Sequence, residues 1–258
     1  MEYDRFAEIY DVWTDTAAAA RANLDFYVDA YVTATGPVVE LGVGDGRIAL
    51  AAAIRGRHVI GVDLSPAMLA RCRERAEREG VLDRLSLVEA DFRTFTLPEP
   101  AALIALPYHS LGHLTSLDQK RDALRHVHAQ LAPGGVFMFD DLLMNRERLE
   151  YVRRVQLRAE YRSPRGRDVL LWVTSLVDEK NQTMRVITWE DELDDEGVLK
   201  QRRYRPLSLS WLEPEQARLL LEETGFTVEA CYGDFRGTIF DAQYATEQVW
   251  VARRGLAA

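Results

Sequence analysis

The stretch Val38-Val-Glu-Leu-Gly-Val-Gly-Asp-Gly46 decides the fold of this chain. Its first four residues read as a short buried strand, and three glycines at alternate positions then form a loop. Glycine lets the backbone take left-handed conformations there and approach a ligand closely. On its own, such a loop fits several cofactors as well as a structural turn. The stretch therefore predicts a ligand site at the end of a first strand without naming the ligand.

Strands and helices alternate around this loop, from residue 38 to residue 140. Besides the first strand, the predicted strands are 58–63, 85–89, 101–106 and 136–139. The predicted helices are 5–33, 47–54, 65–80 and 118–131. Ser65 and Pro66 suit the N-cap and the first turn of the third of these helices. The alternation predicts a parallel sheet that is covered by helices on both faces.

The pattern changes after residue 150, where four longer strands follow one another. They are predicted at 155–161, 168–177, 184–193 and 198–209, with a hairpin turn at Asp194-Asp-Glu-Gly197. A helix at 214–224 and strands at 226–231 and 247–252 then complete the first sheet. We therefore expect three parts, which are N-terminal helices with an α/β core (1–150), an inserted antiparallel β subdomain (151–210), and a C-terminal helix with the closing strands (211–258).

The composition of the 258 residues limits the classes of function. The net charge of −9 argues against a nucleic-acid partner, because phosphate neutralisation needs a basic surface. No apolar run approaches the roughly 18 residues that a membrane span needs. The N-terminus has no apolar segment of the secretory kind. With only two cysteines, we expect a protein of the reducing cytoplasm that has no membrane partner.

Acidic residues lie at the ends of the first two strands of the predicted core and directly after the third. Glu40 would repel a pyrophosphate, but it suits a ligand that has a cationic amine and no phosphate. Asp63, at the end of the second strand, can accept both hydroxyls of a ribose. Asp91 can accept from an adenine amino group, and Phe92 beside it offers a backbone N–H or an apolar face. These acids narrow the range of cofactors that the glycine loop alone leaves open.

Four segments resemble, in order and spacing, the motifs of class I S-adenosylmethionine-dependent methyltransferases. They are Val38–Gly46, Gly61-Val-Asp-Leu-Ser-Pro-Ala-Met-Leu69, Val88-Glu-Ala-Asp-Phe92 and Leu131-Ala-Pro-Gly-Gly-Val136. The resemblance implies an α/β fold with the Rossmann-like class I methyltransferase sheet and S-adenosyl-L-methionine as cofactor. It implies that Glu40 and Gly42, with Gly44 in the same loop, face the methionine amino group.

The resemblance also implies the contacts of the nucleoside part of the cofactor. Asp63 would hold the ribose, and Leu64 and Met68 would line the adenine side. Asp91 and Phe92 would fix the adenine. Leu106, at the end of the fourth strand, would pack near the base or the sulfur.

The segment Pro107-Tyr-His-Ser-Leu-Gly-His-Leu114 resembles the Ser-Ile-Gly-His-Leu stretch of N-methyltransferases that act on nucleotide-linked amino sugars. His113 is the candidate base, and a capping or buried histidine is the competing interpretation. Tyr10-Asp11 resembles a Tyr-Asp in the N-terminal helix of those enzymes, which makes Tyr10 a second catalytic candidate. Tyr10 and Trp13 suit cation–π contact with a sulfonium, or the packing of their own helix.

The match to those N-methyltransferases lapses at 14–20 and at Ala102. We therefore expect a small-molecule acceptor, methylated at nitrogen or oxygen by direct displacement, and leave open whether it is a nucleotide-linked sugar. An NAD-dependent oxidoreductase and a non-catalytic S-adenosylmethionine-binding module are the alternatives. Asp140-Asp141 is interpreted as a substrate contact or as structure, and we expect no metal. The arginine-rich insert is a candidate lid over the acceptor or a candidate homodimer surface.

Overall fold

The computed structural model describes residues 9–16 and 18–256, except for the side chains of 11, 15, 16 and 18–21. It divides into two compact units. The larger unit consists of Ala22–Leu143 and the described residues from Leu212 onward. The smaller unit joins the described residues up to Arg21 with Met144–Trp211. This division differs from the expected one at the N-terminus, because the first described helix groups with the insert and not with the core.

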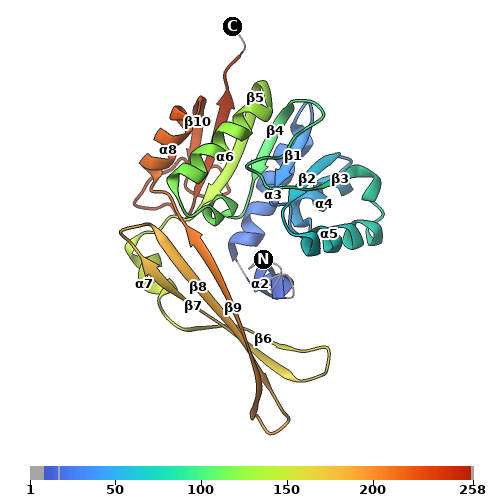
Figure 1. Cartoon of the computed structure of the whole chain (residues 1–258), viewed down its shortest axis with the longest axis vertical. Helices are drawn as coiled ribbons and strands as arrows, with labels where there is room; N and C mark the ends of the chain where they lie inside the picture. Colours follow the sequence, from blue (N-terminus) through green and yellow to red (C-terminus); the bar gives the residue numbers. More distant parts are fainter. Residues whose placement is uncertain (1–8, 17, 257–258) are drawn as a thin grey trace. The chain divides into compact units, whose positions relative to one another are not determined.

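The larger unit is built on a seven-stranded sheet of order β10-β11-β5-β4-β1-β2-β3 (Figure 1). Its strands are β1 (Val38–Leu41), β2 (Val59–Asp63), β3 (Leu85–Glu89), β4 (Ala101–Leu106), β5 (Leu131–Asp141), β10 (Phe226–Tyr232) and β11 (Gln248–Arg254). β11 runs antiparallel to both neighbours, and the remaining neighbours pair in parallel. Strand order reverses between β1 and β4, and open α/β sheets bind ligands at the carboxyl ends of strands at such a point.

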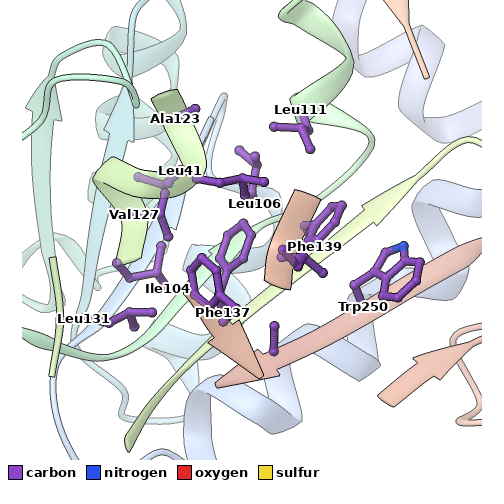
Figure 2. Packing of buried hydrophobic residues seen from close by; sticks show 14 of the residues in the cluster. Leu41, Ile104, Leu106, Leu111, Ala123, Val127, Leu131, Phe137, Phe139 and Trp250 are labelled. Atoms are coloured by element: carbon purple, nitrogen blue, oxygen red, sulfur yellow. The ribbon is translucent and has the colours of Figure 1, made fainter. Parts of the chain in front are cut away.

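Helices cover both faces of this sheet. α3 (Ala18–Thr33), α4 (Arg47–Ile54) and α5 (Pro66–Arg78) contribute buried side chains to the core on one face. α6 (Leu117–Gln130) and α8 (Pro214–Glu223) do so on the other. Figure 2 shows this second core, in which the Phe137 and Phe139 rings stack at 5.2 Å and Phe139 stacks on Trp250 at 6.4 Å. Apolar packing on both faces therefore fixes the strand ends from which the candidate site is built.

Local sequence sets where the helices near the glycine loop begin. Ser65 Oγ accepts a hydrogen bond from the Met68 amide at 3.2 Å, and Pro66 occupies the first turn, as predicted for α5. Gly46 caps α4 in a left-handed conformation, with φ 85°. A Cβ at Gly46 would lie 2.0 Å from Leu50 Cδ1 and 2.6 Å from Cys72 Sγ. Only glycine fits this cap, because it avoids both the backbone strain and the two collisions.

The smaller unit is a four-stranded antiparallel sheet with strands in chain order. The strands are β6 (Gln156–Arg162), β7 (Asp168–Asp178), β8 (Thr183–Leu193) and β9 (Leu199–Ser210), and the helices are α2 (Tyr10–Thr16) and α7 (Arg146–Val152). A buried ion pair joins Glu190 of β8 to Arg205 of β9 at 2.7 Å. The turn predicted at 194–197 connects these two strands. The inserted antiparallel sheet is thus confirmed.

Three elements differ from the sequence-based prediction. The helix predicted over 5–33 is two helices, α2 and α3, and its residues 5–8 lie outside the described part of the chain. β5 begins at Leu131 instead of 136, because Leu131 already pairs with Ala101 of β4 before the Pro-Gly-Gly sequence. Helix α7 was not predicted. It has only seven residues, and its one clear signal is Asn145, whose side chain accepts from the Arg148 amide at the N-cap.

Candidate functional site

The glycine loop places a buried acid at the carboxyl end of β1. Gly42 and Gly44 both adopt left-handed conformations, with φ 66° and 59°. Glu40 is 3 % exposed, and its Oε2 has no hydrogen-bond partner among the described residues. Burial raises the pKa of Glu40 to about 8, although nearby Arg47 and Tyr31 act in the opposite direction. A buried acceptor of this kind is unfavourable unless a donor meets it, so Glu40 suits a cationic donor on a ligand.

Asp63 lies at the end of β2, beside the glycine loop. Its Oδ2 accepts from the Gly44 amide at 2.8 Å, and its Oδ1 accepts from the Ser65 amide at 2.8 Å. Two backbone amides thus fix the orientation of the carboxylate, and a carboxylate oxygen can accept more than one hydrogen bond. The same contact ties the glycine loop to β2. The residue therefore has the place and the acceptor capacity that a pair of ribose hydroxyls needs.

The remaining predicted cofactor contacts have different surroundings. Asp91 forms an ion pair with Arg93 through both carboxylate oxygens, which, with the Arg93 amide, lowers the pKa of Asp91. Phe92 packs partly buried against the core. Leu64 is 48 % exposed, whereas Met68 and Leu106 are buried, Leu106 as a member of the core that Figure 2 shows. Glu40, Gly42, Gly44 and Asp63, in contrast, lie at or directly after the carboxyl ends of the paired strands β1 and β2.

The loop that follows β4 has an unusual backbone. Tyr108 and His109 are consecutive left-handed residues without being glycine, with φ 60° and 58°. The Asp140 carboxylate, at the end of β5, accepts from the Tyr108 amide at 2.9 Å and from the His109 amide at 3.0 Å. It also accepts from the Tyr27 hydroxyl at 2.6 Å. Asp140 is fully buried, and burial raises its pKa. Of the two interpretations of Asp140, this geometry favours structure over substrate contact.

His113 closes this loop at the end of a short 3-10 helix, η3 (Ser110–His113). Burial and the neighbouring charge of Lys120 lower the pKa of His113 to about 4. Lys120 itself is 2 % exposed, donates to the Leu111 carbonyl at 2.7 Å, and has its pKa lowered to about 8 by burial. Burial raises the pKa of Asp141 to about 6, against the opposing charge of Lys120. The sequence did not predict that a buried lysine, Lys120, would lie near His113.

Arg47 directly follows the glycine loop, and its side chain reaches Tyr108 in the loop that follows β4. At the start of α4, its guanidinium donates to the Asn23 side chain at 2.8 Å and lies 5.8 Å from the centre of the Tyr108 ring. His109 lies between two carboxylates, with Nδ1 3.2 Å from Asp140 and Nε2 3.7 Å from Glu247. Sequence reasoning did not single out Arg47 or Glu247. The one sequence signal that could have identified Arg47 is its position directly after the glycine loop.

Two of the predicted residues, Tyr10 and Trp13, lie on α2 in the smaller unit. The Arg158 guanidinium of β6 lies over the Trp13 ring, 4.8 Å from its centre. One face of the Trp13 ring is thus already paired with a cation of the chain itself. This contact supports the packing interpretation of Trp13 within the smaller unit.

The described part of the chain shows neither a cluster of metal ligands nor a membrane-spanning helix. Among the side chains that the structure describes, no group of three or more from His, Cys, Asp and Glu is arranged to hold a metal ion. No described helix is long and apolar enough to cross a membrane.

Comparisons with known proteins agree with this geometry. Residues 38–135 match a family model described as a methyltransferase domain, which confirms the resemblance predicted from the motifs. An uncharacterised methyltransferase of Geobacillus kaustophilus is 33 % identical over 141 residues, which cover 54 % of this chain and 61 % of that protein. The chain thus spans less than two thirds of the length of this curated relative.

Solved structures match nearly the whole chain. The CcbJ methyltransferase from Streptomyces caelestis superposes with a TM-score of 0.78 over 96 % of both chains, at 24 % identity. CalS10, an amino pentose methyltransferase from Micromonospora echinaspora whose structure holds SAM, gives 0.69 over 90 % of this chain and 89 % of its own, at 22 % identity. At these identities the likeness shows a shared fold, and the expected class I methyltransferase architecture with its antiparallel insert is confirmed.

Proposed function

We propose that this chain is a methyltransferase that moves the methyl group of S-adenosyl-L-methionine to a nitrogen or oxygen of a small-molecule acceptor. The observation that carries the proposal is the Glu40 carboxylate, buried beside the left-handed glycine loop with Oε2 lacking a partner among the described residues. An NAD-dependent oxidoreductase would place a pyrophosphate at such a loop, and an anion there disfavours the charged form of Glu40 and offers its buried oxygen no donor.

The residues present fit the cofactor in three places. Glu40 would accept from the methionine ammonium group, which supplies the donor that its buried oxygen lacks. Asp63, held by the amides of Gly44 and Ser65, would accept from the ribose hydroxyls. Asp91 and Phe92 would border the adenine, together with Leu64 and Met68. Glu40 and Asp63 are the better supported of these, because Asp91 is already paired with Arg93.

When bound, the cofactor supplies a methyl group that is activated by its attachment to a sulfonium. A lone pair on the acceptor would take up this methyl group, and S-adenosylhomocysteine would be the leaving group. The chain's own task is to hold donor and acceptor in line and to keep water out, which can supply much of the acceleration. The acceptor proton must leave as the new bond forms, and a nearby base assists that departure.

His113 is the proposed base, and its surroundings limit how much it can contribute. With its pKa lowered to about 4, it is neutral at pH 7, which is the form that can accept a proton. A base that weak holds a proton poorly at pH 7, since each pKa unit corresponds to about 1.4 kcal/mol. We therefore propose that alignment supplies the larger part of the acceleration and His113 the smaller part.

For the acceptor, we propose an amine- or hydroxyl-bearing small molecule, with nucleotide-linked amino sugars as the first class to test. The resemblance of residues 107–114 to N-methyltransferases of that class supports this choice, and so does the structural likeness to CalS10, an amino pentose methyltransferase. Tyr10, proposed as a catalytic residue, and Trp13 would act from α2. The cytoplasm remains the expected location.

A homodimer through the insert is proposed from one row of side chains. Leu157, Trp172, Trp189 and Tyr204 are direct cross-strand partners on β6, β7, β8 and β9, so they share one face of the sheet. The two ends of the row are exposed, Leu157 at 50 % and Tyr204 at 49 %. Sedimentation velocity of Leu157→Asp tests this, with Leu219→Asp on α8, 55 % exposed, as control. A wild-type monomer contradicts the dimer.

Ligand-induced thermal shifts test the main proposal. S-adenosylhomocysteine should raise the melting temperature of the wild-type chain, and NAD should not. A shift with NAD alone would favour the oxidoreductase, and no shift with either would count against both. Incubation with S-adenosylmethionine and a panel of free and nucleotide-linked amino sugars, followed by mass spectrometry, then separates an enzyme from a binding module. The enzyme adds the mass of one methyl group to a member of the panel.

A further inference from the structure

The acceptor-side loop, defined here as residues 107–113, holds a backbone conformation that disfavours its own residues. A left-handed conformation is costly for residues other than glycine, although asparagine, aspartate and histidine adopt it more often than the others. Tyr108 and His109 adopt it in succession, with φ 60° and 58°. Such strain persists where the surroundings over-determine it, and it gathers at functional sites. A particular group in the fold must therefore stabilise these two residues.

Asp140 is that group. Its carboxylate accepts from both strained residues, from the Tyr108 amide at 2.9 Å and from the His109 amide at 3.0 Å. Hydrogen bonds from backbone amides to a carboxylate are stronger than those to a neutral acceptor. Asp140 is fully buried, at the end of β5. The Tyr27 hydroxyl, at 2.6 Å, is a third donor to the same group. With three donors already in place, the carboxylate acts on the loop and not on a substrate.

The conformation that Asp140 holds brings the loop against the glycine loop. A Cβ placed on Gly42 would lie 3.2 Å from Ser110 Oγ, so Ser110 occupies the space that the glycine leaves free. Ser110 in turn donates to the Pro107 carbonyl at 2.7 Å, which closes the turn. On the far side, Lys120 of α6 donates to the Leu111 carbonyl at 2.7 Å. The loop is thus held from β5 at one end and from α6 at the other.

We propose that Asp140 is a positioning residue of the methyl-transfer site, because its carboxylate holds Tyr108 and His109 in the left-handed conformation that sets residues 107–113 against the glycine loop. This inference rests on the proposed function, since it assigns the loop to the wall of the cofactor site. It separates two neighbouring acids that look alike in sequence, because Asp141 instead accepts from the Leu142 and Leu212 amides.

Asp140→Asn tests the proposal with almost no change in side-chain volume. An asparagine has one acceptor oxygen, so at least one loop amide would face a donor instead of an acceptor. We expect hydrogen exchange at the Tyr108 and His109 amides to accelerate at least tenfold, with the amides of the central sheet unchanged. Calorimetric titration should show about tenfold weaker binding of S-adenosylhomocysteine. Tyr27→Phe is the matched control, because it removes a donor to the same carboxylate but leaves both loop amides paired.

A second variant separates positioning from general support of the core. Glycine takes φ near 60° without strain, so a chain with His109→Gly depends less on the carboxylate. The loss of S-adenosylhomocysteine affinity from Asp140→Asn should therefore be several-fold smaller in the His109→Gly background than in the wild-type background. Equal losses in the two backgrounds would overturn the proposal, and so would wild-type affinity and exchange in Asp140→Asn.

Two further outcomes remain decisive. If Asp140→Asn does not fold, exchange in the wild-type chain still tests the inference, because Tyr108 and His109 amides that exchange like an unstructured loop would overturn it. If the wild-type chain itself fails to bind S-adenosylhomocysteine while the two amides are protected, the proposed function fails and the structural role of Asp140 stands. The two failures are therefore distinguishable.

Discussion

Glu40 is the residue on which the proposed cofactor site depends most. A carboxylate that is 3 % exposed has lost most of its hydration, and burial raises its pKa to about 8. The free protein at neutral pH therefore holds Glu40 largely as the neutral acid. A bound ammonium group would reverse this, since an opposite charge within hydrogen-bond distance favours the carboxylate. Binding and deprotonation of Glu40 are thus expected to occur together.

Glu40→Gln should weaken binding of S-adenosylhomocysteine by roughly 10- to 100-fold, because hydrogen bonds to charged groups contribute about 1.5–3 kcal/mol. Wild-type binding at pH 7 should release close to one proton, since the pKa of Glu40 falls from about 8 when the ammonium binds. Titration calorimetry in buffers of different ionisation enthalpy measures the proton directly. The glutamine variant should release none. Equal proton release from both proteins would show that Glu40 does not meet the amino group.

His113 gives a prediction about pH dependence. Its pKa, lowered to about 4 by burial and by Lys120, lies below the range in which an ordinary histidine titrates. The profile of kcat/KM, measured with an acceptor found in the screen, should lack an inflection from His113 between pH 6 and 7. His113→Gln should lower kcat by about tenfold or less, which is below the roughly 100- to 10,000-fold that a general base typically contributes. A loss of 1000-fold, with cofactor affinity retained, would assign His113 a larger share than proposed here.

At the scale of elements, the junction of glycine loop and α4 combines two demands on one residue. Gly46 must adopt a left-handed conformation, and it must leave room for Leu50 and Cys72. Gly56, at the other end of α4, has φ 91° and no neighbour within 4 Å of an added Cβ. The two glycines share the backbone requirement and differ in the steric one. Comparing them separates the two contributions to stability.

Gly56→Ala should destabilise the chain by about 1–2 kcal/mol, the usual penalty for a left-handed residue with a side chain. Gly46→Ala should destabilise it by clearly more, because the added methyl overlaps Leu50 Cδ1 at 2.0 Å and Cys72 Sγ at 2.6 Å. Urea unfolding of the two variants without ligand measures both values. A Gly46 variant no less stable than the Gly56 variant would mean that Leu50 and Cys72 move aside easily.

At the scale of the whole molecule, the larger unit buries several titratable groups whose pKa values depart from the ordinary. Burial raises the pKa of Glu40 to about 8 and that of Asp141 to about 6, and it lowers the pKa of Lys120 to about 8. For an acid whose pKa is higher in the folded state, the folded state binds more protons, and stability falls as pH rises from the unfolded to the folded value. For Lys120 the sign is opposite, and its window lies above pH 8.

Between pH 6.5 and pH 8, Glu40 is therefore expected to lower the stability of the ligand-free protein as pH rises, by roughly 2 kcal/mol. His113, with a pKa of about 4 against an unfolded value near 6.5, acts in the opposite direction and changes the stability by only about 0.4 kcal/mol in this window. Urea unfolding at several pH values, for the wild-type chain and for Glu40→Gln, measures the effect. The difference in unfolding free energy between the two should grow toward pH 8, in favour of the variant. If the difference in unfolding free energy does not change with pH, the pKa of Glu40 does not lie near 8.

Sequence reasoning predicted the arrangement of the proposed cofactor residues better than that of the proposed acceptor-side residues. Glu40, Gly42 and Gly44 belong to one short segment, and Asp63 ends the next strand, so the βαβ connection alone brings them together. The acceptor half depends on contacts between segments far apart in the chain. Asp140 lies 32 residues from Tyr108 and 113 from Tyr27, and nothing in the sequence pairs them.

The sequence by itself determined the alternation of strands and helices in the core, the glycine loop with an acid beside it, and the antiparallel insert. Each of these depends on local patterns, namely periodicity, capping residues and turn composition, which act within about ten residues. Tertiary structure alone decided that α2 groups with the insert, that β5 begins at Leu131, and that Asp140 holds the left-handed loop. The physical reason is that a strained conformation or a buried charge is stabilised by whatever packs against it, and such partners come from distant parts of the chain.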